Sequence, residues 1–390
     1  MNTATTVSTL ALIASMALAA PAMAQTPSDG DQTIVVTATA LNDERSEALQ
    51  GVTTLDRDDI IANLGSGLGE TLDSQPGVAS TFFGRGASRP IIRGLGEDRI
   101  RVLSNGTAQI DASSVSPDHA VASEGLEAQT IEVLRGSAAL AYGGNAVGGV
   151  VNVLDGRILE AAPDQAFSGQ AMASNATGLD ESQAAAALTF ANDRFALRVD
   201  GFIRDAGDYE IPGFAYSAAK REEEIEEALA EGETPEDFAE GTAENSFAEA
   251  EGLGIGLSTY GDWGFAGLSA RRLESSYGIP KAHAHGEEEE EEAIFPGPFI
   301  DLEQTRYEAR LGLTQGFGII TAIRADAAYV DYTHSEIEES GEIGTTFTNE
   351  GFDARIEAFH TLGAFTGVAG ISGSSLEFSA VGEEAFVTLS

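Results

Sequence analysis

Residues 131–153 read Ile131-Glu-Val-Leu-Arg-Gly-Ser-Ala-Ala-Leu-Ala-Tyr-Gly-Gly-Asn-Ala-Val-Gly-Gly-Val-Val-Asn-Val153. The apolar runs at both ends predict two short strands, and the glycines of Gly143–Gly149 permit a tight turn between them. A glycine-rich loop can also cradle phosphate, but here no Lys-Ser/Thr pair follows it, which disfavours that reading. The stretch therefore predicts the centre of a packed domain.

The surrounding residues extend this domain to about 50–157. Asp56 precedes Arg57–Asn63 and caps a short helix with acidic residues in its first turn. Arg99–Leu103 and Thr107–Asp111 flank Asn105-Gly106, the pair that favours a two-residue hairpin turn. Strands and helices thus alternate, and the fold class of this part is α/β.

After Arg157 the pattern changes to period-2 strands with one apolar face and one charged face. In Thr305–Thr314, for example, Tyr307 and Leu311 alternate with Arg306 and Arg310. Such strands predict an antiparallel transmembrane β-barrel, with a soluble antiparallel sandwich as the alternative. We count about nine or ten strands, near 165–175, 182–192, 194–207, 247–261, 263–276, 299–315, 317–334, 345–361 and 363–380. Two acidic inserts, 208–246 and 277–298, interrupt them.

Composition limits the function. The chain has 390 residues and a formal net charge of −42, which excludes a nucleic-acid binder that relies on positive charge. It contains no cysteine, so disulfides and thiolate metal sites are absent. Residues 10–20 form a short apolar core that is followed by Ala22-Met-Ala24, which predicts a signal peptide at 1–24 although residues 2–9 lack Lys and Arg. No nucleophile–base arrangement is visible, and we expect no enzymatic activity.

The motifs together resemble the plug domain of TonB-dependent outer-membrane receptors. The resemblance rests on Ile92–Gly96, Arg99–Leu103 and the quoted stretch 131–153. It implies a plug at 50–157, a partial barrel at 158–390 and a location in a Gram-negative-type outer membrane, in contact with its lipid. TonB and its inner-membrane energy-transducing complex are the implied partners. The TonB box is assigned within the linker 25–49, at Thr33, Ile34, Val35, Val36, Thr37, Ala38 and Thr39.

A plug must fit inside a polar lumen, so it should present charges to the barrel wall. We expect Arg93, Arg99, Arg135 and Glu132 to face that wall. The resemblance also implies about 22 strands, more than the chain has room for. We therefore expect the chain to be truncated, with roughly half of the barrel missing.

Within this family the chain is similar to the zinc-receptor branch. The matching segments are Asp111–Ala120, Tyr277–Pro280 leading to a histidine pair, and Tyr332–Glu336. Zinc accepts imidazole nitrogen and carboxylate oxygen, and without cysteine these are the strong ligands left. The predicted metal ligands are Asp118, His119, His283, His285, His334, Glu336 and Glu338. If the first strand runs outward, the inserts and the connections at 176–181 and 335–344 face the outside.

Several readings stay open from the residues alone. His283 and His285, followed by Glu287–Glu292, also fit a solvated acidic loop, and His119 after Asp118 fits a polar helix start. His360 is expected to be interfacial. Our hypothesis is TonB-dependent transport of zinc or a zinc complex, with zinc as cargo and no prosthetic group. The alternatives are a receptor for an iron–siderophore, haem or cobalamin, and a non-transporting adhesion or signalling protein.

Overall fold

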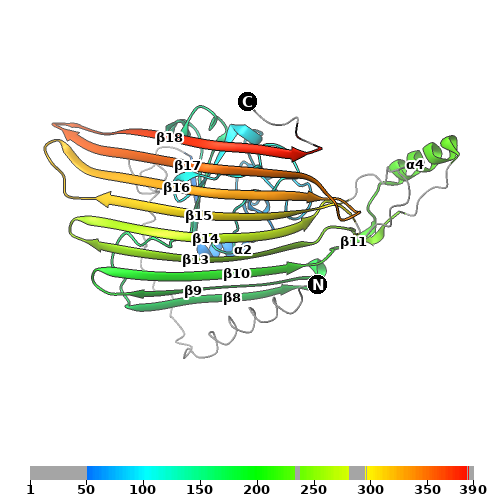
Figure 1. Cartoon of the computed structure of the whole chain (residues 1–390), viewed down its shortest axis with the longest axis horizontal. Coiled ribbons are helices and arrows are strands. Elements are labelled where there is room, and N and C mark those ends of the chain that lie inside the picture. The colour runs from blue at the N-terminus through cyan, green and yellow to red at the C-terminus, as the bar shows by residue number, and fades with distance from the viewer. Residues whose placement is uncertain (1–50, 233–237, 281–294, 296, 384, 386–390) are drawn as a thin grey trace.

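The computed structural model describes residues 51–232, 238–280, 295, 297–383 and 385. In these ranges a small α/β domain is followed by one large antiparallel sheet, and the domain lies against one face of that sheet (Figure 1). None of the helices in these ranges is long and apolar enough to cross a membrane.

The α/β domain contains seven strands and four short helical segments. Its strands are β1 (Val52–Leu55), β2 (Val78–Ser80), β3 (Pro90–Ile92), β4 (Ile100–Ser104), β5 (Thr107–Ala108), β6 (Thr130–Leu134) and β7 (Gly149–Leu154). Its α-helices are α2 (Arg57–Ala62) and α3 (Leu68–Leu72), and its 3-10 turns are η1 (Glu97–Arg99) and η2 (Ser137–Tyr142). Five strands form a sheet in the order β1-β6-β7-β4-β5, in which only β4 and β7 run parallel. The predicted α/β class is confirmed.

The local signals in the sequence have clear counterparts in this domain. Asp56 and Asp59 cap each other's backbone N–H groups at the start of α2. Asn105 and Gly106 both have positive φ and close the β4–β5 hairpin. The stretch 131–153 contains most of β6 and β7. A side chain at Gly149 would place its Cβ 2.6 Å from the carbonyl oxygen of Leu134. The glycine there is therefore a steric requirement.

The large sheet has nine strands, and neighbouring strands in it are all antiparallel. They are β8 (Phe167–Ala176), β9 (Glu181–Ala191), β10 (Phe195–Ala206), β13 (Ala248–Gly261), β14 (Gly264–Gly278), β15 (Phe299–Leu313), β16 (Ile320–Ile337), β17 (Ile343–Leu362) and β18 (Phe365–Gly382). The nine predicted segments match these strands within a few residues. The sheet is open, with β8 and β18 at its edges.

The two faces of the large sheet differ as the alternation predicts. On β15, Arg306 is buried against the α/β domain, where it donates to the carbonyl of Ala108, and Arg310 is buried on the same face of the sheet, whereas Tyr307 points away and is 52% exposed. On β13, Leu253 and Leu257 are likewise exposed. Charged side chains are thus inside and apolar side chains outside, the reverse of a soluble sandwich and the arrangement typical of a barrel in lipid.

The first acidic insert extends beyond one end of the sheet. It contains β11 (Glu210–Phe214), α4 (Ala218–Glu231) and β12 (Glu240–Thr242), between β10 and β13 (Figure 1). Ser217 caps α4 by accepting from the N–H of Lys220, and Gly232 ends it with positive φ. Residues 281–294 of the second insert lie outside the described residues.

Buried ion pairs join the α/β domain to the sheet. Glu127 accepts from Arg157 Nη2 at 2.5 Å and from Arg271 Nε of β14 at 2.9 Å. Arg157 also pairs with Asp200 of β10 at 2.6 Å. Burial raises the pKa of Glu127, but Arg271 and Arg157 outweigh it and hold that pKa below its ordinary value. Further pairs cross the boundary, namely Arg85–Glu181 and Glu124–Arg204.

The residues that make these contacts are not those we predicted. Arg135 donates to Thr53 and to the carbonyl of Pro76, and Glu132 accepts from Asn152, all within the α/β domain. Arg93 and Arg99 are exposed. The prediction failed because the side of a short strand that meets the wall depends on the domain's orientation, which local sequence does not encode.

Glu127→Gln is expected to lower the free energy of unfolding by about 3 kcal/mol, because it leaves two buried guanidiniums without their shared carboxylate. The measurement is urea denaturation of the membrane-folded protein. The control is Glu303→Gln. The Glu303 side chain pairs with Arg272 and is 64% exposed, so this variant should change the free energy of unfolding by less than about 0.5 kcal/mol. Equal effects of the two variants would contradict the interpretation.

Candidate metal centre

The site begins with the loop 111–122, which follows the β4–β5 hairpin. Asp111 closes the base of this loop: Oδ1 accepts from the N–H and hydroxyl of Ser113, and Oδ2 accepts from the N–H of Ala122 at 3.1 Å. Burial raises the pKa of Asp111 in spite of these three hydrogen bonds, which lower it. The loop is therefore a folded unit that presents His119 in a fixed position.

The sheet holds this loop from the other side. Tyr277 of β14 is fully buried, and its hydroxyl donates to the carbonyl of Asp118 at 3.0 Å and accepts from the N–H of Ala120 at 2.8 Å. Both peptide groups that flank His119 are thus bound to one side chain of the wall. A shift of the His119 backbone away from β14 would therefore break both hydrogen bonds.

Three ligand atoms meet at this point. His119 Nε2 lies 3.0 Å from Glu336 Oε1, and one ligand atom from each of His119, His334 and Glu336 falls within 4.8 Å of the others. The rings of His119 and His334 are 4.4 Å apart in an edge-on arrangement. We call these three residues the His–His–Glu cluster.

Strand periodicity explains how β16 contributes two members. His334 and Glu336 are two residues apart, so both point to the inner face of β16. β15 and β17 flank them, and Phe347 lies directly opposite His334 in the β16–β17 register. The Phe347 ring is 4.8 Å from that of His119 and 4.7 Å from that of His334. The two imidazoles are fully buried in this apolar surrounding.

In each imidazole, the Nδ1 nitrogen has a hydrogen-bond partner outside the cluster. His119 Nδ1 lies 3.0 Å from the carbonyl oxygen of Ala112, and His334 Nδ1 lies 2.7 Å from the hydroxyl of Tyr332. His334 Nε2 is buried and has no hydrogen-bond partner among the described residues. Each ring therefore turns Nε2 toward the cluster.

Electrostatics favour a cation here. Burial lowers the pKa of His119, but the hydrogen bond to Glu336 and the nearby charge of Asp118 outweigh it, and the pKa lies above its ordinary value. Two imidazole nitrogens and one carboxylate oxygen are a common zinc ligand set, with room for a fourth ligand.

The structure brings some of the predicted ligands together and leaves others apart. His119, His334 and Glu336 come together in the cluster. The Asp118 carboxylate lies outside it and accepts from the Ser116 hydroxyl. Glu338 is exposed in the turn after β16 and is also outside the cluster. His283, His285 and Thr33–Thr39 are outside the described residues, so their assignments stay predictions.

Sequence reasoning gave no role to three aromatic side chains of the site, namely Tyr277, Tyr332 and Phe347. Two of them stand in the segments that carry the zinc-receptor resemblance, and Tyr332 shares the inner-face parity of His334. Parity could have placed Tyr332 beside the ligands, but the bonds of Tyr277 depend on the position of a loop more than 150 residues earlier in the chain.

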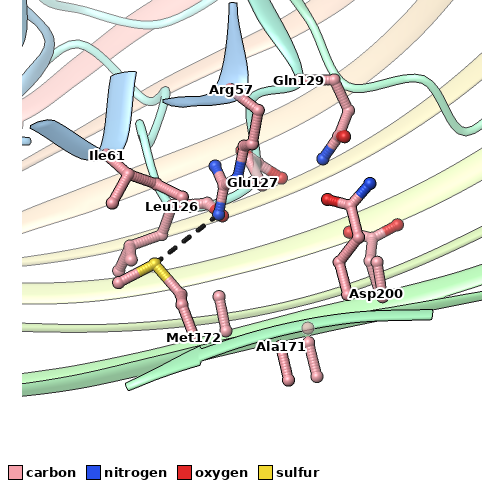
Figure 2. A pocket seen from close by; sticks show the side chains of 13 residues that line it. Arg57, Ile61, Leu126, Glu127, Gln129, Ala171, Met172 and Asp200 are labelled. Atoms are coloured by element: carbon pink, nitrogen blue, oxygen red, sulfur yellow. Dashed lines mark hydrogen bonds between the residues drawn. The ribbon is translucent and has the colours of Figure 1, made fainter. Parts of the chain in front are cut away.

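A pocket elsewhere on the boundary is not a rival site. It lies between α2 and β8–β10, and Figure 2 shows Arg57, Met172 and Asp200 around it. Its volume is about 50 Å³, enough for a few water molecules but far below the hundreds of Å³ typical of organic ligand sites. Arg57 is occupied with the carbonyls of Gly125, Leu126 and Ala128.

Comparison with known proteins identifies the first domain. Residues 44–150 match the TonB-dependent Receptor Plug Domain family. This domain is a TonB-dependent receptor plug. The plug is the α/β domain described above, and the nine-stranded sheet matches the barrel wall of such receptors in solved structures.

Curated relatives agree with this assignment. The ferrienterobactin receptor of Escherichia coli (strain K12) is 35% identical over 166 residues, covering 37% of this chain and 21% of that protein. The iron-regulated outer membrane virulence protein of Vibrio cholerae is 29% identical over 224 residues, covering 56% and 32%. The chain spans a fifth to a third of the length of these relatives.

Solved structures share the fold of plug and wall. The copper transporter OprC superposes with a TM-score of 0.63 at 14% identity, covering 84% of this chain and 46% of that one. The FrpB iron transporter of Neisseria meningitidis gives 0.61 at 13% identity, covering 84% and 49%. At these identities the likeness concerns the fold alone.

Glu336→Gln is expected to lower the pKa of His119 in metal-free protein, because it removes the carboxylate that favours the imidazolium. The raised folded-state pKa stabilises the protein fully below about pH 6.5, and this contribution is lost as pH rises through the folded pKa. Histidine-selective NMR titration in EDTA measures the shift. Glu338→Gln, the control, should leave the pKa of His119 unchanged; an unchanged value in Glu336→Gln would contradict the prediction.

Proposed function

We propose that this chain is part of a TonB-dependent receptor that carries zinc, or a zinc complex, across the outer membrane of a Gram-negative-type cell. The observation that carries the proposal is the His–His–Glu cluster, whose ligands are divided between the plug and the sheet.

The ligand chemistry supports zinc as the cargo. Mg²⁺ and Ca²⁺ prefer all-oxygen sites, whereas two of the three ligands here are nitrogen. The chain has no cysteine to favour Cu(I). Imidazole also suits other late transition metals, so the choice of zinc among them rests on the resemblance of Asp111–Ala120 and Tyr332–Glu336 to zinc receptors.

The division of the ligands supports a release mechanism. His119 belongs to the plug, while His334 and Glu336 belong to the wall. Zinc–nitrogen bonds are about 2.0–2.1 Å long, so a plug displacement of a few ångströms would remove one ligand from the set. A pull on the TonB box at Thr33–Thr39 would reach the plug through β1, an edge strand of its sheet. Energy from TonB would thereby weaken binding.

The remaining parts fit the same proposal. The signal peptide 1–24 would direct export, and the outward side chains Leu253 and Leu257 would contact outer-membrane lipid. The acidic inserts at 208–246 and 277–298, with His283 and His285, would raise the local cation concentration at the entrance.

Uptake of an iron–siderophore is the second candidate. It is favoured by the curated relatives, a ferrienterobactin receptor and an iron-regulated outer membrane virulence protein. It would require a binding surface outside the enclosed cluster, and it predicts ferric-siderophore binding that is insensitive to loss of His119 and His334.

Changing His119 and His334 together to Ala is expected to weaken zinc binding by at least about 100-fold, since loss of a single outer-shell partner already costs about 10- to 100-fold and here two of three ligands are lost. Isothermal titration calorimetry on the membrane-folded protein measures this. The control is His360→Ala, because His360 lies near the opposite end of the sheet, paired with Ile320 at the start of β16. Unchanged zinc affinity in the double variant would reject the site.

Val35→Pro is expected to abolish zinc uptake without changing zinc affinity. A TonB box binds by adding a strand to a sheet, and proline lacks the N–H that such pairing needs. Co-purification with the periplasmic domain of TonB and zinc accumulation by cells measure the two effects. Thr39→Ala, a milder change at the end of the box, serves as the control. Normal uptake by the proline variant would contradict the assignment of the TonB box.

A further inference from the structure

The proposed zinc function leaves the Tyr332 hydroxyl without a role. Tyr332 and His334 lie on the same face of β16, both fully buried, and the hydroxyl oxygen is 2.7 Å from His334 Nδ1. The other nitrogen of His334, Nε2, has no hydrogen-bond partner among the described residues. A buried imidazole is thus bound at one end and free at the end that faces the cluster.

Packing alone cannot produce this orientation. Phe347 lies against His334 with ring centroids 4.7 Å apart and an angle of 30°, which fixes the plane of the imidazole. An imidazole rotated by 180° has nearly the same shape, so an apolar neighbour hardly distinguishes its nitrogens from its carbons. The Tyr332 hydroxyl does distinguish them, because only one orientation forms the hydrogen bond to Nδ1.

His119 shows the same arrangement with a different partner. Its Nδ1 bonds to the carbonyl oxygen of Ala112, and its Nε2 points to Glu336. A carbonyl only accepts, so it holds the proton on Nδ1 of His119. A hydroxyl can donate or accept, so Tyr332 can bond to His334 in either tautomer. Imidazoles that bind metals usually have such an outer partner for the second nitrogen.

We propose that Tyr332 is a positioning residue for the metal: its hydroxyl fixes the His334 ring so that Nε2 is presented to zinc. The inference rests on the proposed zinc function and names a determinant of affinity beyond the three ligands. With zinc on Nε2, the proton of His334 resides on Nδ1 and is donated to the Tyr332 oxygen.

The test is Tyr332→Phe, which removes the hydroxyl and keeps the ring. Zinc affinity measured by calorimetry should fall by about 10- to 100-fold. The matched control is Tyr260→Phe, because Tyr260 is also buried and its hydroxyl donates to backbone carbonyls of Asn192 and Phe195, away from the cluster. Its zinc affinity should stay within twofold of that of the unaltered protein.

A second readout separates positioning from packing. The ¹⁵N chemical shifts of His334 in the zinc-bound protein should show Nδ1 protonated and Nε2 bound to metal, and Tyr332→Phe should lose that single state. Wild-type affinity in Tyr332→Phe, or weaker binding with the ¹⁵N signature unchanged, would overturn the inference. If the unaltered protein and Tyr260→Phe both fail to bind zinc, the proposed function itself is wrong.

Discussion

Charge pairing across the buried boundary between plug and sheet is the constraint on which the rest of this structure depends. The inner face of the sheet buries guanidiniums such as Arg271 and Arg306, and the plug supplies carboxylates and carbonyls to meet them. Glu127 is shared between Arg157 and Arg271, so its loss would take from Arg271 its carboxylate partner among the described residues and leave Arg157 with only Asp155 and Asp200. Because these pairs hold the plug in one position, side chains on the plug and on the wall can share a single site.

The His–His–Glu cluster uses this fixed position. Tyr277 holds the loop that carries His119, while β16 presents His334 and Glu336 by simple alternation. In an apolar surrounding, two imidazoles and a carboxylate are expensive to desolvate unless a cation or proton joins them. In the proposed transport cycle, the division of the ligands between plug and sheet would make zinc binding sensitive to plug movement. Binding and release would therefore depend on a single mechanical variable, the position of the plug.

The sequence predicted the strands better than the site. Period-2 alternation placed nine strands within a few residues, because the lipid-facing and lumen-facing sides impose it along every strand. His119, His334 and Glu336 were identified through a resemblance, and the structure brings them together. Arg135 and Glu132 were misplaced, since a plug residue's direction depends on how the whole domain sits. Tyr277 received no role because its partners, Asp118 and Ala120, lie far away in the chain.

The sequence by itself determined the plug-and-barrel plan, the outward apolar face and the histidines available for metal binding. The outward apolar face follows from period-2 alternation, on which water and lipid act directly, whereas the plug and the candidate metal-binding histidines were identified through motifs that resemble a known family. Tertiary structure alone decided that His119 meets Glu336 across 217 positions of chain, and that Tyr277 binds the loop that carries His119. Such contacts depend on the register of strands and on how the plug is seated, and these are fixed only when distant segments pack together.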